Sequence, residues 1–161
     1  MASAAKNLST YTPKNLISLA DKTVAVVVAE WNEEVTEKLF AGARQVLLEN
    51  GLSPERLLRR AVPGSFELSL GAQWMAQRPE VDAVITLGCI IQGETRHFDF
   101  IAQAVATGIT EVSLKTNKPI IFGVLTPDNQ QQALDRAGGQ HGNKGEEAAA
   151  TAIKMLGFEP R

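Results

Sequence analysis

One segment, Val84 to Phe100, constrains the fold of this chain more than any other. It opens with a nearly continuous apolar run, Val84–Ile91 (VITLGCII). An apolar run that does not alternate with polar residues is typical of a parallel strand covered on both faces. Polar and titratable side chains follow directly, between Gln92 and Asp99, ahead of a helical pattern. Ligands of open α/β sheets bind beyond the carboxyl ends of the strands, so we expect the functional site at this edge.

Three other segments are predicted to be strands. They are the β-branched run Thr23–Ala29, the weaker apolar stretch Leu57–Val62 and the apolar run Pro119–Leu125. Apolar residues at helical spacing follow each strand, and a last helix is expected from Glu146 to about Leu156. This order predicts an α/β fold: a three-layer α/β/α sandwich around a four-stranded parallel sheet, flavodoxin-like in arrangement.

Several boundaries are predicted from local signals. We expect Ser65 to cap a helix whose Phe66, Leu70 and Trp74 share one face. Thr126 and Pro127 suit the N-cap and first turn of another helix. Residues 137–145, which contain four glycines, are expected to form a loop.

With 161 residues the chain is long enough for one domain with its own core. Residues 1–20 show no sustained period and are interpreted as an N-terminal arm, ahead of a single domain at residues 21–161. A net charge of −2, without long charged runs, gives no reason to expect nucleic acid or a membrane surface as partner. The start of the chain has no signal-like apolar segment, so we expect a cytoplasmic protein.

Metals and nucleotide cofactors are not indicated by the sequence. His97 and His141 lack neighbouring ligands at metal-binding spacing, and the glycine cluster at 138–145 lacks the spacing of a phosphate-binding loop. The lone Cys89 lies inside an apolar strand, so we expect a packed small residue.

The side chains after the strands suggest a site with three parts. His97 could transfer protons, although a solvated surface histidine is the alternative. Gly93, Glu94 and Thr95 are expected at a helix N-terminus that favours an anion, and Arg136 and Lys144 flank the glycine loop. Trp31 and Phe66 follow strands and could stack on a flat heterocycle; packing onto the next helix is the alternative, and the default for Phe66.

Together these motifs resemble the 6,7-dimethyl-8-ribityllumazine synthase family over nearly the whole chain after the arm. The segments that carry the resemblance are Trp31–Glu33, Val62–Leu68 (VPGSFEL), Leu87–Thr95 (LGCIIQGET) with His97–Asp99, Phe122–Thr126 (FGVLT), and Gln132–Gly139 (QALDRAGG) running into Gly142–Gly145 (GNKG).

The resemblance implies a transferase of riboflavin biosynthesis. Such an enzyme condenses 5-amino-6-(D-ribitylamino)uracil with 3,4-dihydroxy-2-butanone 4-phosphate, releases phosphate and water, and needs neither a metal nor a redox cofactor. The family works as pentamers, in some members packed into icosahedral shells of sixty subunits, with each site formed between neighbouring subunits. One subunit would supply the side with Trp31, Phe66 and His97, and its neighbour the side with Phe122 and Arg136.

The resemblance also implies a role for each matching residue. His97 would transfer protons. The pyrimidine and its ribityl chain would contact Trp31, Phe66, Glu67, Leu68, Ile90, Ile91, Gln92 and Phe122. The butanone phosphate would contact Glu94, Thr95, Arg136 and Lys144. The chain departs from common family patterns at Trp31, where Phe is frequent, at Gln92, where Arg is common, and at Arg96, where Pro is common.

Two other functions remain open from the sequence. One is a flavin or lumazine carrier that uses Trp31 for stacking without turnover, which tight riboflavin binding without lumazine formation would reveal. The other is a purely structural shell, which would bind neither substrate.

Overall fold

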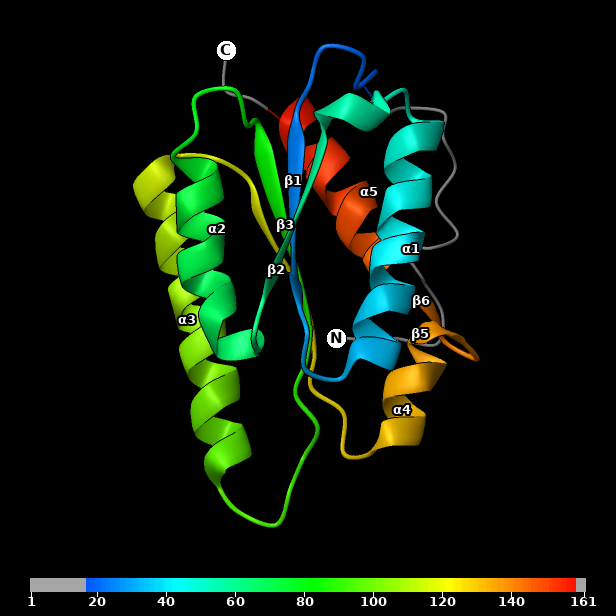
Figure 1. Ribbon diagram of the computed structural model, residues 1–161, viewed down its shortest axis with the longest axis vertical. Coiled ribbons are helices and arrows are strands. Elements are labelled where there is room, and N and C mark those ends of the chain that lie inside the picture. The colour runs from blue at the N-terminus through cyan, green and yellow to red at the C-terminus, as the bar shows by residue number, and fades with distance from the viewer. Residues whose placement is uncertain (1–16, 159–161) are drawn as a thin grey trace.

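The computed structural model describes residues 17–158, and it contains a four-stranded parallel sheet in the order β2-β1-β3-β4. The strands are β1 (Val24–Ala29), β2 (Leu57–Val62), β3 (Ala83–Cys89) and β4 (Ile120–Leu125). Helices cover both faces of the sheet (Figure 1). The predicted α/β/α sandwich with a flavodoxin-like arrangement is therefore confirmed.

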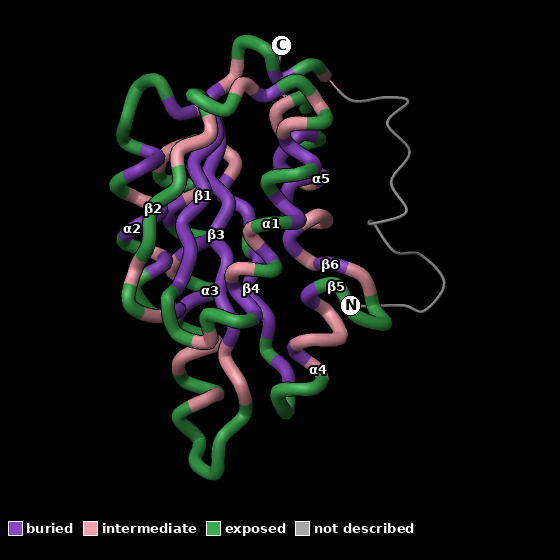
Figure 2. Tube along the Cα trace, turned by 45° about the vertical axis from the view of Figure 1, so that its right-hand side comes forward, coloured by how far each residue is buried: buried purple, intermediate pink, exposed green. Residues whose placement is uncertain are grey.

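The sheet has a buried centre and a more exposed edge. Every residue of β1 and β3 is buried, as the continuous apolar runs predicted (Figure 2). At the edge, β2 exposes Arg59 and Arg60, which explains why its apolar pattern in the sequence is weak. Strand β4 forms the other edge, and its Phe122 is 43% exposed.

Five helices surround the sheet within residues 17–158. They are α1 (Glu33–Glu49), α2 (Leu68–Ala76), α3 (His97–Thr116), α4 (Gln130–Asp135) and α5 (Lys144–Gly157). Helices α1 and α5 lie on one face of the sheet and α2 and α3 on the other (Figure 1). Each pair closes its own apolar cluster against the sheet, so the core has two layers.

The predicted helix starts are wrong at two places. Ser65 lies inside a short 3-10 helix, Ser65–Glu67, and its side chain caps no helix. Helix α4 begins after Asn129, whose side-chain oxygen accepts a hydrogen bond from the backbone N–H of Gln132 at 3.0 Å. Asparagine is a better N-cap than threonine, so the helix starts at the side-chain hydrogen bond of Asn129 and not at Thr126.

The predicted glycine loop is also wrong, because it contains an antiparallel hairpin. Strands β5 (Ala137–Gly139) and β6 (Gly142–Asn143) pair with each other, and α5 begins directly after them. Gly138 and Gly142 have positive φ angles of 111° and 73°. Glycine is the residue that adopts such angles without strain, so the glycines that suggested a loop permit a tight turn instead.

Most of the predicted arm, residues 1–16, lies outside the described part of the chain. Its last residues pack on the domain. Leu19 is fully buried in the core, and its backbone N–H donates to the carbonyl of Asn50 at 3.0 Å. Within residues 17–158, no helix combines the length and the apolar character needed to cross a membrane.

Candidate active site

A cavity that we call the β1–β3 cavity lies at the carboxyl ends of β1 and β3. Its volume is about 310 Å³. Among the residues predicted for the site, six line it: Trp31, Phe66, Glu67, Ile90, Ile91 and His97. Five others line it as well, namely Asn32, Gly64, Ser65, Cys89 and Ile101. Two exposed aromatic rings, an imidazole and a carboxylate therefore share one cavity at the predicted edge of the sheet.

Trp31 is held by its backbone while its ring stays exposed. Its N–H donates to the carbonyl of Pro63 at 3.1 Å, beyond the end of β2. The next residue, Asn32, has a left-handed φ of 62°, and its side-chain amide donates to the carbonyl of Cys89 at 2.8 Å. These bonds join the ends of three strands. The indole, 72% exposed, is thus presented to solvent from a fixed backbone, as expected for a residue that suits a core poorly.

His97 is the first residue of α3, and Ile101 lies one turn later on the same side. The backbone N–H of His97 points to the hydroxyl of Thr95 at 3.4 Å. The helix begins where the sequence pattern predicted, and Gly93, Glu94 and Thr95 lie just ahead of its first turn. Its first backbone N–H groups belong to His97 and the residues after it, and an anion site at this N-terminus would use those groups.

Four predicted site residues line neither this cavity nor the second one described below. Leu68 is fully buried and packs in the core layer under α2 and α3. Gln92, Glu94 and Thr95 are exposed in the segment between β3 and α3. The amide of Gln92 donates to the carbonyl of Gly93 at 2.8 Å. Their roles in binding stay predictions.

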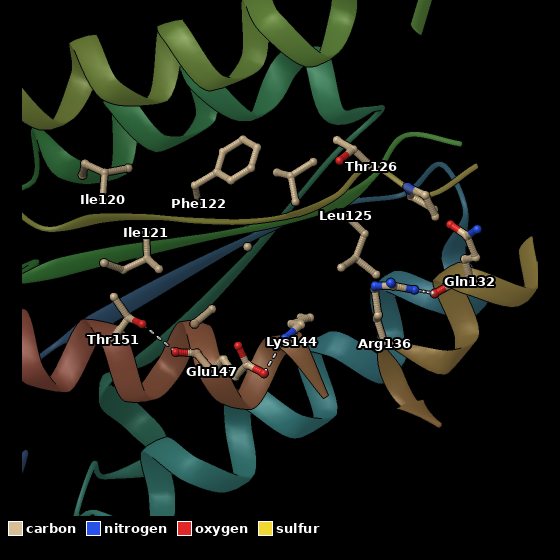
Figure 3. A pocket seen from close by; sticks show the side chains of 14 residues that line it. Ile120, Ile121, Phe122, Leu125, Thr126, Gln132, Arg136, Lys144, Glu147 and Thr151 are labelled. Carbon is tan, nitrogen blue, oxygen red and sulfur yellow. Dashed lines mark hydrogen bonds and ion pairs between the residues drawn. The ribbon is translucent and has the colours of Figure 1, made fainter. Parts of the chain in front are cut away.

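The second cavity lies along the free edge of β4, and we call it the β4-edge cavity. Its volume is about 610 Å³. It is lined by three residues predicted for the site, Phe122, Arg136 and Lys144, which come from β4, the end of α4 and the start of α5. Figure 3 shows Phe122 on one side of β4, with Arg136 and Lys144 on the side of Ile121. The cavity therefore wraps around an open strand edge.

The β5–β6 hairpin sets the spacing of the two cations. The backbone N–H of Lys144 donates to the carbonyl of Arg136 at 2.9 Å, which extends the hairpin by one bond. The guanidinium of Arg136 donates to the carbonyl of Gln132 at 3.0 Å, and the ammonium of Lys144 lies 2.6 Å from the carboxylate of Glu147 (Figure 3). Two positive side chains that are eight positions apart in the sequence thus enter one cavity.

Sequence reasoning missed several lining residues. Asn32 and Ser65 adjoin predicted residues and Gly64 lies two positions before Phe66, so their proximity was a usable signal. Ile101, Glu147 and Thr151 carry a weaker signal: each lies three, four or seven positions after a predicted residue in the same helix, a spacing that puts both on one side.

Two groups in the β1–β3 cavity have unusual surroundings. The hydroxyl of Ser65 is buried and has no hydrogen-bond partner among the described residues. Burial raises the pKa of the Cys89 thiol to about 11, which keeps it protonated near neutrality. The prediction that Cys89 is a packed small residue agrees with its 1% exposure.

The two cavities share no lining residue. His97 and Arg136 therefore belong to different sites within one chain. Among the described residues, no group of three or more His, Cys, Asp or Glu side chains is placed to hold a metal ion. The chemistry available to the side chains is stacking, hydrogen bonding, proton transfer and binding of an anion.

The sheet, its helical layers and these cavities define a flavodoxin-like α/β protein with cavities at the ends and edge of its sheet, where small molecules bind in such folds. The family model for 6,7-dimethyl-8-ribityllumazine synthase matches residues 21–159. The chain belongs to this enzyme family.

Relatives named 6,7-dimethyl-8-ribityllumazine synthase match over almost their whole length. The protein of Cytophaga hutchinsonii is 64% identical, with 97% of this chain and 98% of that protein covered. The protein of Parabacteroides distasonis is 50% identical, with 98% and 99% covered, and that of Porphyromonas gingivalis is 48% identical, with 99% of each covered. The resemblance found in the sequence is confirmed.

Proposed function

We propose that this chain condenses 5-amino-6-(D-ribitylamino)uracil with 3,4-dihydroxy-2-butanone 4-phosphate to give 6,7-dimethyl-8-ribityllumazine, phosphate and water. This is the penultimate step of riboflavin biosynthesis. The observation that carries the proposal is the meeting of Trp31, Phe66 and His97 around one cavity in a chain of this family. We propose that this chain acts in the cytoplasm.

The β1–β3 cavity suits the pyrimidine substrate. Trp31 and Phe66 expose 72% and 57% of their surfaces beside it, so both rings are free to stack on a flat heterocycle. Glu67, at the end of the 3-10 helix, offers carboxylate oxygens to ribityl hydroxyl groups. Ile90 and Ile91 border the ring with apolar surface, a common combination in small-molecule sites.

His97 is the proton-transfer residue in this proposal. Imine formation, loss of phosphate and ring closure each move protons between nitrogen, carbon and oxygen, and an imidazole has one nitrogen that accepts a proton and one that donates it. Holding both substrates side by side supplies much of the remaining acceleration.

The β4-edge cavity suits the phosphate of the second substrate. The planar guanidinium of Arg136 presents paired N–H donors that match phosphate oxygens, and Lys144 adds a second positive charge. Phe122 would close the ring site from this side. Glu94 and Thr95, ahead of α3, are proposed to contact the same phosphate together with the first N–H groups of that helix.

The two cavities share no lining residue, and we propose a homo-oligomer in which the β1–β3 cavity of one subunit meets the β4-edge cavity of the next. Support comes from exposed apolar surface: Leu70 and Trp74 of α2 expose 48% and 62%, and Phe100 of α3 exposes 67%. Large apolar side chains clustered on a surface are typical of subunit interfaces. Native mass spectrometry is expected to give multiples of five subunits, either a pentamer or a shell of sixty; a stable monomer would disprove this part.

The activity is tested by mixing the purified protein with both substrates and following lumazine fluorescence. The rate of lumazine formation by the wild type is expected to be far above the uncatalysed background. His97→Ala is expected to form lumazine roughly 10²–10³-fold more slowly than the wild type while still binding the pyrimidine. Phe98→Leu is a suitable control, because it alters a neighbouring residue that does not line the cavity. Wild-type turnover by His97→Ala would remove His97 from the mechanism. Tight riboflavin binding without turnover would favour a carrier.

A further inference from the structure

The β4-edge cavity contains an acidic side chain that the proposed chemistry does not use. Glu147 lies in α5, one turn after Lys144, and its carboxylate is 2.6 Å from the Lys144 ammonium (Figure 3). The side chains are only 23% exposed at Lys144 and 15% at Glu147. Water and salt screen a pair at this depth less than a pair on the open surface.

The charges of the cavity show what Glu147 does to an anion. Three charged side chains line it: Arg136 and Lys144, each +1, and Glu147, −1, which gives a sum of +1. A phosphate monoester near neutrality carries a charge close to −2. Arg136 and Lys144 alone would balance the charge of the phosphate. With Glu147 included, the cavity and the bound phosphate together carry an excess of negative charge.

The two cations also differ in their readiness to bind. No acidic side chain within residues 17–158 forms an ion pair with Arg136, whose guanidinium donates to the carbonyl of Gln132. Lys144 is already paired with Glu147. A phosphate that reaches the cavity meets an arginine without a carboxylate partner, but must compete for the lysine.

The backbone around this pair is firmly held. Asn143 is 8% exposed; its side-chain oxygen accepts from the N–H of Gly145 at 2.8 Å and its amide donates to the carbonyl of Lys38 at 2.8 Å. The hydroxyl of Thr151 donates to the carbonyl of Glu147 at 2.8 Å. With the backbone fixed, exchange of Lys144 between Glu147 and an anion needs side-chain rotation alone.

We propose that Glu147 competes with the phosphate group for Lys144 and thereby lowers the affinity of the β4-edge cavity for phosphate. This inference rests on the proposed function, in which Arg136 and Lys144 hold that group. Each turnover releases inorganic phosphate, and a cavity that bound phosphate too tightly would be blocked by its own product. Glu147 favours release of phosphate by offering Lys144 a partner when the phosphate leaves.

The test is calorimetric titration of inorganic phosphate into the assembled protein, without turnover. A carboxylate within a few ångströms of a bound dianion repels it, so Glu147→Gln is expected to bind phosphate about five- to tenfold more tightly than wild type. The glutamine keeps the shape of the side chain and accepts a hydrogen bond from Lys144. Glu147→Ala, which removes the charge without adding an amide, is expected to shift affinity in the same direction.

Glu146→Gln is the matched control. It removes one negative charge from the neighbouring position of α5, but Glu146 does not line the cavity. Its phosphate affinity is expected to stay within about twofold of wild type, since the charge is farther from the anion and better screened. Lys144→Met is expected to weaken phosphate binding. This variant tests whether the titration measures binding in the β4-edge cavity.

Unchanged or weaker phosphate binding in both Glu147 variants would overturn the proposal, because a residue that only orients Lys144 cannot tighten binding when it is lost. Absence of phosphate binding to wild type would overturn it too. In steady-state kinetics, Glu147→Gln is expected to lower the KM for the butanone phosphate and leave the KM for the pyrimidine unchanged. Since calorimetry needs no turnover, failure of the proposed reaction and failure of this inference give different results.

Discussion

At the scale of single residues, Asn32 is the position where local geometry matters most for the β1–β3 cavity. Its backbone is left-handed, with a φ of 62°, and its side chain binds the carbonyl of Cys89. Asparagine tolerates this conformation better than most residues do. The tryptophan just before it is presented to the cavity by this turn.

Two substitutions separate the backbone role of Asn32 from its hydrogen bond. Asn32→Gly keeps the backbone conformation and loses the bond, which should cost about 1 kcal/mol of unfolding free energy. Asn32→Ala loses the bond and adds the strain of a Cβ in the left-handed region, a further 1 kcal/mol or so. Urea unfolding measures both. Equal stability of the two variants would show that the backbone angle costs nothing here.

The raised pKa of Glu146 predicts that the folding stability depends on pH. Burial raises the pKa of its carboxyl, and the negative charges of Glu49 and Glu147 add to this. With the folded pKa above the unfolded one, the folded state prefers the protonated form, so stability is lost as pH rises from the unfolded pKa through the folded one. Above both, the loss is constant.

Glu146→Gln should therefore be more stable than wild type at pH 7. The difference should shrink as pH falls towards the ordinary glutamate value of about 4.3. Thermal unfolding at a series of pH values measures it. A gain that does not depend on pH would assign the effect to packing instead of charge.

At the scale of elements, the crossing of α1 and α5 is set by one glycine. A Cβ built on Gly145 would overlap the carbonyl oxygen of Leu39 in α1. The first turn of α5 thus touches the backbone of α1, and this contact places Lys144 and Glu147 at the β4-edge cavity.

Gly145→Ala should destabilise the protein by about 3 kcal/mol, because the opposing group is backbone and has little room to move. Gly93→Ala is the matched control: nothing lies within 4 Å of a Cβ built there, so its effect should stay within about 0.5 kcal/mol. Denaturant unfolding of both variants makes the comparison. A small loss at Gly145 would mean that α1 and α5 move apart easily.

Sequence reasoning at this scale succeeded where a pattern is local. The buried parallel strands were predicted within a residue or two, because continuous apolar runs arise from burial on both faces. It failed for Ala137–Asn143, where glycines permit both a loop and a hairpin. The helical face of Phe66, Leu70 and Trp74 was predicted as a face, but periodicity does not show whether a partner covers it, and in the chain alone it is exposed.

At the scale of the whole molecule, His97 and Arg136 belong to separate cavities of the same chain. Strand β4 ends the sheet, so the cavity along it opens outwards, towards any neighbouring chain. The proposed site joins the β1–β3 cavity of one subunit to the β4-edge cavity of the next.

Mixing two inactive variants tests this arrangement. His97→Ala and Arg136→Ala should each lose most activity. In oligomers assembled at random from equal amounts of both, about one interface in four pairs an intact His97 with a neighbour's intact Arg136, so about a quarter of wild-type activity should return. Mixtures that stay as inactive as the separate variants would place each site within a single subunit.

The sequence by itself determined the order of strands and helices, the family and the side chains most suited to the chemistry, since each of these depends on residues close together in the chain. Tertiary structure alone decided which of these side chains meet. It divided them between two cavities, placed Leu68 in the core, and paired Lys144 with Glu147 beside Arg136. Such contacts depend on how distant segments pack, and local periodicity carries no information about that packing.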